Sequence, residues 1–438
     1  MEAASGEFVL YWMQASQRTL HNHALEFAID KANHLGLPAV VFFGIAEDYP
    51  EANERHFKFM LEGLSEVREE LERLGILMVV RRNEPWKGAL ELSREAALVV
   101  CDRGYLRHQV SWRRHLAERA ECGIFEVESD VVVPVDAAAD REMYSAATLR
   151  PRIHRSLDRY LAPPEHSTPL KCSIELDLPS VDLTDPVAAL EGLNVDRSVR
   201  GVDWLKGGTS NALSRFREFL DTGLDRYHLD RNDPSLEIQS DMAPYLHFGQ
   251  ISPITLALEA NEAGSPGTEA FLEELIVRRE LAFNFVRYND RYDSFDCLPN
   301  WARDTLLEHS RDIREYNYSV SELEAGGAHD PYWNAAQREM VVRGKMHNYM
   351  RMYWGKKVLE WLEDPREAYM TVLHLNNKYS LDGRDPNSYA GVAWCFGKHD
   401  RPWKERPIFG KVRYMNDNGL RRKFDIGSYV DRARSLEG

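Results

Sequence analysis

The organisation of the chain is best seen from the stretch Arg343-Gly-Lys-Met-His-Asn-Tyr-Met-Arg-Met-Tyr-Trp-Gly-Lys-Lys-Val-Leu-Glu-Trp361. After the helix breaker Gly344, this stretch predicts a helix of about five turns. Asn348, Arg351 and Met352 are spaced i, i+3 and i+4, so they share one face of that helix. An amide and a guanidinium on such a face differ from an ordinary buried core, which favours Leu, Ile and Val.

Three tryptophans accompany this helix. Trp354 and Trp361 are seven residues apart, which places them on one stripe about 10.5 Å apart along the axis. Trp333 lies 21 residues before Trp354, and in one straight helix the two would be about 31 Å apart. Because Gly344 breaks the pattern, the helix of Trp333 can fold back and bring the indoles together. From spacing alone, an aromatic core with Arg351 in an ion pair is the competing interpretation.

Three motifs carry a family resemblance. Gly344-Lys-Met-His-Asn-Tyr-Met-Arg-Met352 resembles the signature of the photolyase/cryptochrome flavoproteins. Asp382-Gly-Arg-Asp-Pro-Asn387 and Trp403-Lys-Glu-Arg-Pro-Ile-Phe-Gly-Lys-Val-Arg-Tyr-Met415 resemble the class II cyclobutane pyrimidine dimer (CPD) DNA photolyases. The resemblance is dense from about Gly207 onward and diffuse before it. It implies noncovalent FAD that is active when fully reduced, and light-driven splitting of pyrimidine dimers flipped out of double-stranded DNA.

Composition narrows the class of protein. A chain of 438 residues with 43% hydrophobic content suggests two domains with sizeable cores. The net charge of −15 argues against nonspecific binding of polyanions, although a local basic surface could still bind DNA. The five cysteines are widely spaced without a Cys-x-x-Cys pair, which indicates a reducing compartment and no metal site. No apolar run approaches the roughly 20 residues of a membrane span, and we expect a cytoplasmic protein, nucleoid-associated, or nuclear in a eukaryote. We also expect a monomer.

The first 135 residues alternate short apolar runs with helical patterns. The runs predict buried parallel strands at Phe8–Met13, Ala39–Phe43, Ile76–Val80, Leu98–Asp102 and Ile124–Val127. This alternation predicts an α/β doubly wound parallel sheet in an N-terminal domain. In the resembling family such a domain can carry an antenna chromophore of deazaflavin or folate type. No Gly-x-Gly-x-x-Gly follows a strand, so a dinucleotide site in this domain is not supported. No residue pattern identifies an antenna pigment, and an empty structural domain is the equally open alternative.

The rest of the chain divides in two. Six prolines fall between Pro151 and Pro186, and residues 136–200 are therefore predicted to be a connector between domains. Residues 201–438 predict a mostly α-helical domain that binds FAD and DNA.

The candidate FAD diphosphate site precedes Pro244, a residue type favoured at the start of a helix. A helix N-terminus offers free N–H groups to phosphate, although most such caps serve only their own helix. By resemblance, the site consists of Gln239, Ser240, Asp241, Met242 and Ala243, with Tyr227 beside it. The chain departs from the family here, because Ala243 replaces a usual Ser and Gln239 replaces a Thr. Ser240 and the backbone would then carry more of the binding.

The candidate catalytic carboxyl is Glu280, in a helix predicted over Phe271–Tyr288. No basic residue stands three or four positions from it, so its carboxyl can be desolvated and neutral, a hydrogen-bond donor. A Glu that reaches a distant Arg or solvent is the alternative. By resemblance, Glu280 contacts the damaged bases, while Met352 and Trp394 line the lesion slot.

The resemblance also assigns the flavin ring and an electron route. Asn376 would face the N5 edge, Arg351 and Asp382 would pair beside it, and Asn348 and Asp382 would bond the ring. Arg384 and Asn387 lie nearby in the same Gly/Pro/Asp/Asn-rich loop. Trp354 would be the tryptophan nearest the flavin, with Trp333 and Trp361 as the outer pair.

The window Lys398–Lys423 holds nine Lys/Arg against three Asp/Glu in an otherwise acidic chain. Aromatic residues interleave with the basic ones, which suits DNA phosphates and exposed bases, although a charged run is commonly only a solvated face. The candidate DNA-binding residues are Arg401, Trp403 and Arg413, on a predicted hairpin. The main alternative function is a cryptochrome-like FAD photoreceptor without repair activity; a flavin oxidoreductase would need a nicotinamide site, for which there is no motif.

Overall fold

The structure is a computed structural model that describes residues 5–436. It forms two compact units that interleave along the chain. Unit 1 comprises Met1–Pro134, Ser156–Arg217 and Asp241–Glu262, and unit 2 comprises Val135–Arg155, Glu218–Ser240 and Ala263–Gly438. The composition predicts three consecutive segments. The chain crosses between the two units more often than this prediction implies.

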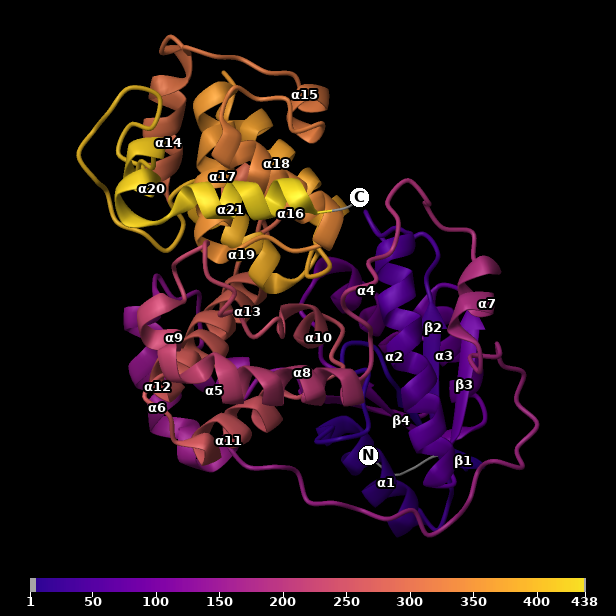
Figure 1. Cartoon of the computed structure of the whole chain (residues 1–438). Helices are drawn as coiled ribbons and strands as arrows, with labels where there is room; N and C mark the ends of the chain where they lie inside the picture. Colours follow the sequence, from indigo (N-terminus) through magenta and orange to yellow (C-terminus); the bar gives the residue numbers. More distant parts are fainter. Residues whose placement is uncertain (1–4, 437–438) are drawn as a thin grey trace. The chain divides into compact units, whose positions relative to one another are not determined.

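Unit 1 is built around a parallel sheet (Figure 1). Its strands are β1 (Phe8–Trp12), β2 (Ala39–Ile45), β3 (Leu77–Arg82), β4 (Ala96–Asp102) and β5 (Gly123–Val127). The strand order is β3-β2-β1-β4-β5, and all four pairings are parallel. The predicted doubly wound α/β domain is confirmed, with strand ends shifted by at most a few residues.

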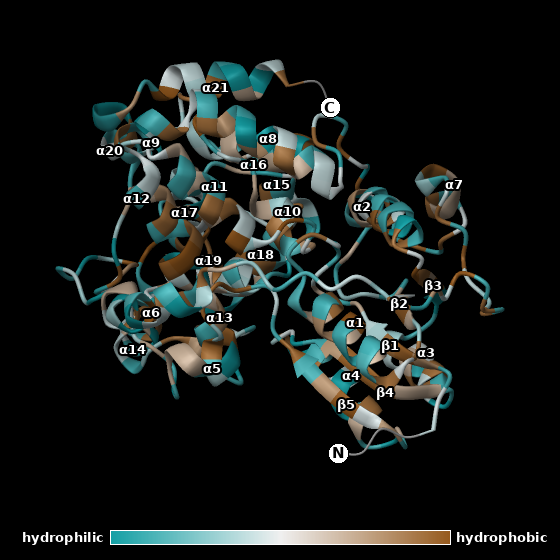
Figure 2. Cartoon of the chain, turned by 90° about the horizontal axis from the view of Figure 1, so that it is seen from below, coloured by the Kyte–Doolittle hydropathy of each residue, from teal (hydrophilic) through white to brown (hydrophobic). Residues whose placement is uncertain are grey.

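Helices cover both faces of this sheet. One buried cluster joins the sheet to α1 (His23–Leu35) and α2 (Glu54–Arg73), and a second joins it to α3 (Pro85–Ser93) and α4 (Arg107–Ala117). Helix α2 shows hydrophobic and hydrophilic sides in Figure 2, as expected for a helix that packs on a sheet along one face. Further helices in or partly in unit 1 are α7 (Pro186–Glu191), α8 (Thr209–Thr222), α10 (Ala243–His247) and α11 (Pro253–Ala263).

The region predicted to be a connector has more structure than its proline content indicates. It contains α5 (Val135–Ala138), α6 (Ala146–Tyr160) and α7, and α6 continues through Pro151. Leu183, Leu190 and Leu193 are buried in the core cluster of α1 and α2. Part of the segment therefore belongs to the core of unit 1, because scattered leucines can pack there without helical periodicity.

Unit 2 is mostly helical, as predicted. Its remaining elements are α9 (Leu224–Asp230), α12 (Thr268–Leu272), η1 (Glu273–Arg278), α13 (Arg279–Tyr288), η2 (Phe295–Cys297), α14 (Asn300–Glu308), η3 (His309–Arg311), α15 (Val320–Glu324), α16 (Pro331–Arg343), α17 (Asn348–Trp361), α18 (Pro365–Tyr379), α19 (Pro386–Cys395), α20 (Asp417–Lys423) and α21 (Ile426–Ser435). The helix predicted over Phe271–Tyr288 is interrupted by η1, a π-helix.

The end of α16 agrees with the prediction, whereas the start and length of α17 differ from it. Gly344 ends α16 with φ of 67°, a left-handed value that favours glycine, so its role as breaker is confirmed. Helix α17, however, begins only at Asn348, and its 14 residues make about four turns rather than five. The His347 side chain caps it by accepting from the Tyr349 N–H at 3.2 Å. Burial lowers the pKa of His347 to about 4, so the cap stays a neutral acceptor.

Candidate functional site

Three buried tryptophans form one cluster between α16 and α17. The rings of Trp333 and Trp354 stack with centroids 6.2 Å apart and planes 11° apart, and Trp333 meets Trp361 at 5.4 Å. Each side chain is at most 1% exposed. The Trp333 Nε1–H donates to the Trp354 carbonyl and the Trp354 Nε1–H to Gln337 Oε1, each at 3.0 Å. The predicted approach of the indoles is confirmed, with Trp333 touching both others.

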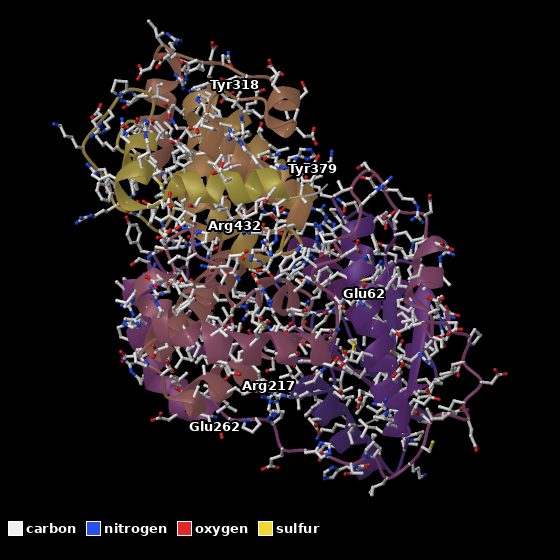
Figure 3. The ribbon with its side chains drawn as sticks, viewed as in Figure 1. Glu62, Arg217, Glu262, Tyr318, Tyr379 and Arg432 are labelled. Atoms are coloured by element: carbon white, nitrogen blue, oxygen red, sulfur yellow. The ribbon has the colours of Figure 1, made fainter. Side chains whose placement is uncertain are left out.

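Ring contacts continue from Trp361 towards the surface. Trp361 meets Tyr318 at 5.1 Å and His329 at 5.6 Å, and His329 stacks on Tyr316 at 3.6 Å. Tyr316 is 39% exposed; Tyr318 is labelled in Figure 3. Tyr316 and Tyr318 lie in the segment before α15, and His329 lies between α15 and α16. No periodicity marks these segments, so the sequence did not indicate their residues.

The predicted pair beside the flavin is present. Arg351 on α17 donates through both Nη atoms to the Asp382 carboxylate at 3.2–3.3 Å. The Arg351 Nε atom is buried without a partner among the described residues. Asn348, one turn before Arg351, is exposed. A flavin ring brings carbonyl and nitrogen acceptors, so the orphaned Nε and the free amide fit it chemically.

The loop after α18 is ordered by its own hydrogen bonds, as predicted. Arg384 has φ of 62°, and its N–H donates to Asn377 Oδ1 at 2.9 Å while Nη1 donates to the Asn377 carbonyl at 2.6 Å. Asn376 is 1% exposed and donates to Ser388. Asn387 donates through N and Nδ2 to Asp385 Oδ1 at 2.8 and 3.0 Å. These bonds hold the loop next to the Arg351–Asp382 pair.

The candidate diphosphate residues are placed as follows. Helix α10 begins at Ala243, one residue before the predicted start at Pro244, with Met242 as a cap that offers no side-chain acceptor. Gln239 Nε2 lies 3.1 Å from His347 Nε2 and donates to the Arg231 carbonyl at 2.9 Å. The unit boundary falls between Ser240 and Asp241.

Two members of this set sit in well-defined surroundings. Within unit 1, Asp241 has φ of 57° and pairs with Arg215 at 2.6 Å. Within unit 2, Tyr227 is buried against Phe219 and Phe271 at 5.6 and 5.8 Å. Desolvation raises the pKa of Tyr227 to about 12, so it stays a neutral phenol.

The residues predicted for the lesion slot are Glu280, Met352 and Trp394. Glu280 on α13 is 3% exposed, which confirms its burial. Met352 Sδ lies 3.9 Å from Cys395 Sγ, and Cys395 follows Trp394 on α19. This contact joins the α17 residues Arg351 and Met352 to the Trp394 end of α19.

Trp394 is held by a buried histidine. The ring of His399 meets Trp394 at 5.8 Å and Phe285 at 5.7 Å. His399 Nδ1 lies 2.9 Å from the Tyr144 carbonyl and must donate to it, because a carbonyl only accepts. Burial lowers the pKa of His399 to about 4, so the ring is neutral. Its Nε2 is buried without a partner among the described residues.

The basic window forms the predicted hairpin. Arg406 and Gly410 exchange backbone hydrogen bonds at 2.8–2.9 Å, and the Trp403 N–H donates to the Lys411 carbonyl at 2.8 Å. Trp403 is 41% exposed. The guanidinium groups of Arg401 and Arg413 lie 5.6 and 5.2 Å from its ring. An exposed indole between two cations is suited to stacking on bases beside phosphates.

Unit 1 has a second polar site, at the carboxyl ends of β1 and β4. The sheet order reverses between these strands, the position where doubly wound sheets commonly bind ligands. Asp102 accepts from Tyr11 Oη and from the N–H groups of Gln14 and Ser16 at 2.8–2.9 Å, and burial raises its pKa to about 6. Buried atoms without a partner in residues 5–436 gather in the following loop: both amide atoms of Gln14, Gln17 Oε1, Arg18 Nε and His23 Nδ1.

Other chemistries find little support in the described residues. All five cysteines are free. Within residues 5–436, no group of three His, Cys, Asp or Glu side chains could hold a metal ion. No helix in the same range is long and apolar enough to span a bilayer.

Comparisons with known proteins identify the family of the chain. Residues 9–171 match the family described as DNA photolyase. A deoxyribodipyrimidine photo-lyase of Methanothermobacter thermautotrophicus is 53% identical over 98% of this chain and 95% of that protein. The enzyme of the same name from Arabidopsis thaliana is 40% identical over 98% of this chain and 89% of that protein.

Solved structures share the fold. A bacterial class III photolyase from Agrobacterium tumefaciens superposes with a TM-score of 0.75 at 19% identity, covering 98% of this chain and 87% of that chain. An archaeal photolyase from Sulfolobus tokodaii with two FAD molecules gives 0.74 at 15% identity, covering 97% and 89%. At these identities the likeness concerns the fold.

Proposed function

The chain belongs to the DNA photolyase family, and we propose that it is a deoxyribodipyrimidine photo-lyase, which uses light to split cyclobutane pyrimidine dimers in DNA. The observation that carries the proposal is the buried Trp354–Trp333–Trp361 cluster between α16 and α17, because α17 also carries Arg351 of the Arg351–Asp382 pair. Stacked indoles can carry electrons, and the Arg351–Asp382 pair can bind a polar ring. A core that only stabilises the fold would not need this combination.

FAD is the cofactor that these residues fit. When bound and reduced, FAD supplies the light-excited electron that opens the cyclobutane ring. Asn348, Arg351, Asn376 and Asp382 would hold its ring, and Arg384 and Asn387 would order the loop around it. The roles of Tyr227 and residues 239–243 at the diphosphate remain predictions, with Gln239 and Ala243 as the departures from the family.

The rest of the site handles the substrate. Glu280 is buried, and a neutral carboxyl there would donate to the pyrimidine carbonyls as negative charge grows on them. Met352 and Trp394 would enclose the dimer and exclude water. Arg401, Trp403 and Arg413 would contact the duplex around the extruded dimer.

Class II is the finer assignment that we propose. It is supported by two sequence motifs, Asp382–Asn387 and Trp403–Met415, and by the contacts among Trp333, Trp354 and Trp361, which a single straight helix would not allow. A cryptochrome-like photoreceptor is the alternative. The presence of Glu280, Met352 and Trp394, which the family resemblance assigns to the lesion slot, supports repair instead. A monomer that acts in the cytoplasm, nucleoid or nucleus also remains a prediction.

Repair of a defined substrate tests the proposal. The purified protein should show flavin absorption bands and, after reduction by dithionite, should restore a dimer-containing oligonucleotide under blue light but not in the dark. Flavin binding without light-dependent repair would favour the photoreceptor, and absence of flavin would refute both.

A second proposal concerns light harvesting. The orphaned polar atoms at the carboxyl ends of β1 and β4 support a polar aromatic ligand there, and we infer an antenna pigment of deazaflavin or folate type. An additional near-ultraviolet or violet absorption band that is lost in Gln17→Leu, while the flavin bands persist, would support it. The same band in both proteins would place the pigment elsewhere.

A further inference from the structure

Trp394 has a second neighbour that the sequence analysis did not consider. The Arg278 guanidinium carbon lies 5.7 Å from the Trp394 ring centroid. Trp394 is half-buried, and its other ring neighbour, His399, is buried and neutral. Arg278 is thus the charged group at this aromatic side chain.

The local backbone explains how Arg278 comes to lie there. It is the last residue of the π-helix η1, two residues before Glu280. In an α-helix, residues i and i+5 point about 140° apart, whereas π-helical turns close at i+5. The π-helix therefore lets Glu273 Oε1 accept from Arg278 Nε at 3.1 Å. Such π segments occur frequently at functional sites.

The Arg278–Glu273 pair engages only one of the three guanidinium nitrogens of Arg278. Only Nε of Arg278 is hydrogen-bonded within residues 5–436, so both Nη groups are free to donate, and the side chain is 37% exposed. The same carboxylate also accepts from Arg150 Nε at 2.9 Å and Nη2 at 2.7 Å. Arg150 has two bonds to Glu273 and no contact with Trp394, whereas Arg278 has one bond and that contact.

Free planar donors beside an aromatic face suit one kind of group. A pyrimidine that stacks on Trp394 brings its backbone phosphate within reach of a neighbouring side chain, and guanidinium Nη pairs bind phosphate oxygens in a bidentate manner. The hydrogen bond from Arg278 Nε to Glu273 orients the guanidinium and leaves its two Nη groups available to a phosphate.

We propose that Arg278 is a lesion-specific phosphate clamp: it covers Trp394 in the free protein and moves onto a phosphate of the flipped dimer when the dimer takes its place. The inference rests on the proposed function, since it needs a dimer in the slot beside Trp394. Undamaged duplex does not enter the slot, so Arg278 would add affinity only for damaged DNA.

The test compares two arginines that share one carboxylate. Arg278→Gln should lower the ratio of affinities for dimer-containing and undamaged duplex about tenfold. It should also make the salt dependence of lesion binding shallower by about 0.9 in slope, the value of one lost phosphate contact. Arg150→Gln is the matched control, because Arg150 is 38% exposed on the same Glu273, and should leave the ratio and the slope unchanged. Arg278→Lys should keep the salt-dependence slope of the parent, because the positive charge remains. Its affinity ratio should lie between those of the parent and Arg278→Gln, because an ammonium lacks the bidentate donors of a guanidinium.

Three results would overturn the inference. One is that Arg278→Gln keeps the affinity ratio and the salt-dependence slope of the parent protein. Another is an equal loss in Arg150→Gln, which would mean that only the Glu273 network matters. The third is a reduced ratio with an unchanged slope, which would make Arg278 a support for Trp394 rather than a phosphate contact. If the parent protein itself binds both duplexes equally, the proposed function fails, and the inference fails with it.

Discussion

Replacing Trp354 with Phe separates two tasks that one flavin protein performs. Repair needs reduced flavin and a bound dimer, whereas photoreduction of oxidised flavin needs an electron route through the protein. Trp354 stacks on Trp333 within the buried cluster, and Phe keeps an aromatic ring there without the easily oxidised indole. We therefore expect Trp354→Phe to lose nearly all photoreduction in blue light with an external donor.

The structural cost of this change can be worked out from the same contacts. Trp354 is 0% exposed, and its Nε1–H donates to Gln337 Oε1, which is itself in a 1% exposed side chain. An orphaned buried acceptor costs about 1–3 kcal/mol. With the smaller ring, the free energy of unfolding should fall by about 2–4 kcal/mol. That is less than the about 5–15 kcal/mol typical of a folded domain, so the variant should stay folded.

The assay follows flavin absorbance under blue light and, separately, repair after reduction by dithionite. Chemically reduced Trp354→Phe should repair dimers at close to the parental yield. The control is Trp12→Phe in unit 1, where another 0% exposed indole has an Nε1 without a partner in the described residues; it should photoreduce normally. Normal photoreduction in Trp354→Phe would refute the electron route. A folded, chemically reduced variant that cannot repair would show that Trp354 supports the site rather than the route.

Four further outcomes are expected. Trp333→Phe and Trp361→Phe should slow photoreduction less than Trp354→Phe, and equal rates in all three would contradict the assigned order. Glu280→Ala should retain FAD but lower the repair yield per photon, because one donor to the developing charge is lost; an unchanged yield would remove Glu280 from the mechanism. Arg413→Ala should weaken binding of dimer-containing duplex more than undamaged duplex in a filter-binding titration, and an equal loss would make it a plain phosphate contact. His399, with its pKa lowered to about 4 by burial, takes up a proton in the unfolded chain below about pH 6.5 but in the folded protein only near pH 4. Its contribution to stability is therefore lost as pH falls through that window, by about 1.4 kcal/mol per pH unit. In His399→Gln, the free energy of unfolding measured by chemical denaturation should fall less steeply with decreasing pH between these two values.

Periodicity and residue type were enough to predict the sheet and the folded-back tryptophans. Continuous apolar runs such as Phe8–Met13, bounded by turn residues and alternating with helical patterns, favour buried strands. Glycine at position 344 favours the end of a helix, and its φ there is left-handed. Both signals are local, and each is confirmed. The start of α17 was misplaced because His347 caps the helix through its ring, and a histidine cap has a weak sequence signature.

The features that sequence reasoning missed depend on contacts between distant segments. The π-helix η1 carries no distinctive residue pattern, so Arg278 could not be assigned to Trp394, which is 116 residues later. Likewise, Tyr318 meets Trp361 only because the segment between η3 and α15 lies against the end of α17. The division of residues 136–200 between two units has the same origin, since it is set by which core buries the leucines.

Helix α17 shows why damage to one task can spare the other. Trp354 bonds Gln337 on α16, Arg351 bonds Asp382 in the turn between α18 and α19, and Met352 contacts Cys395 on α19. Each of these contacts is made to a different element, so substitutions on α17 act through different neighbours. Residues more than about 7–10 Å apart without shared partners contribute nearly additively to stability. The backbone carbonyl of Arg351 and the Met352 Sδ, however, both contact Cys395 Sγ and should couple. A change at Trp354 should therefore lower electron supply and stability without reaching the Arg351–Asp382 pair, while a change at Met352 should disturb the predicted slot and the backbone at Arg351 together.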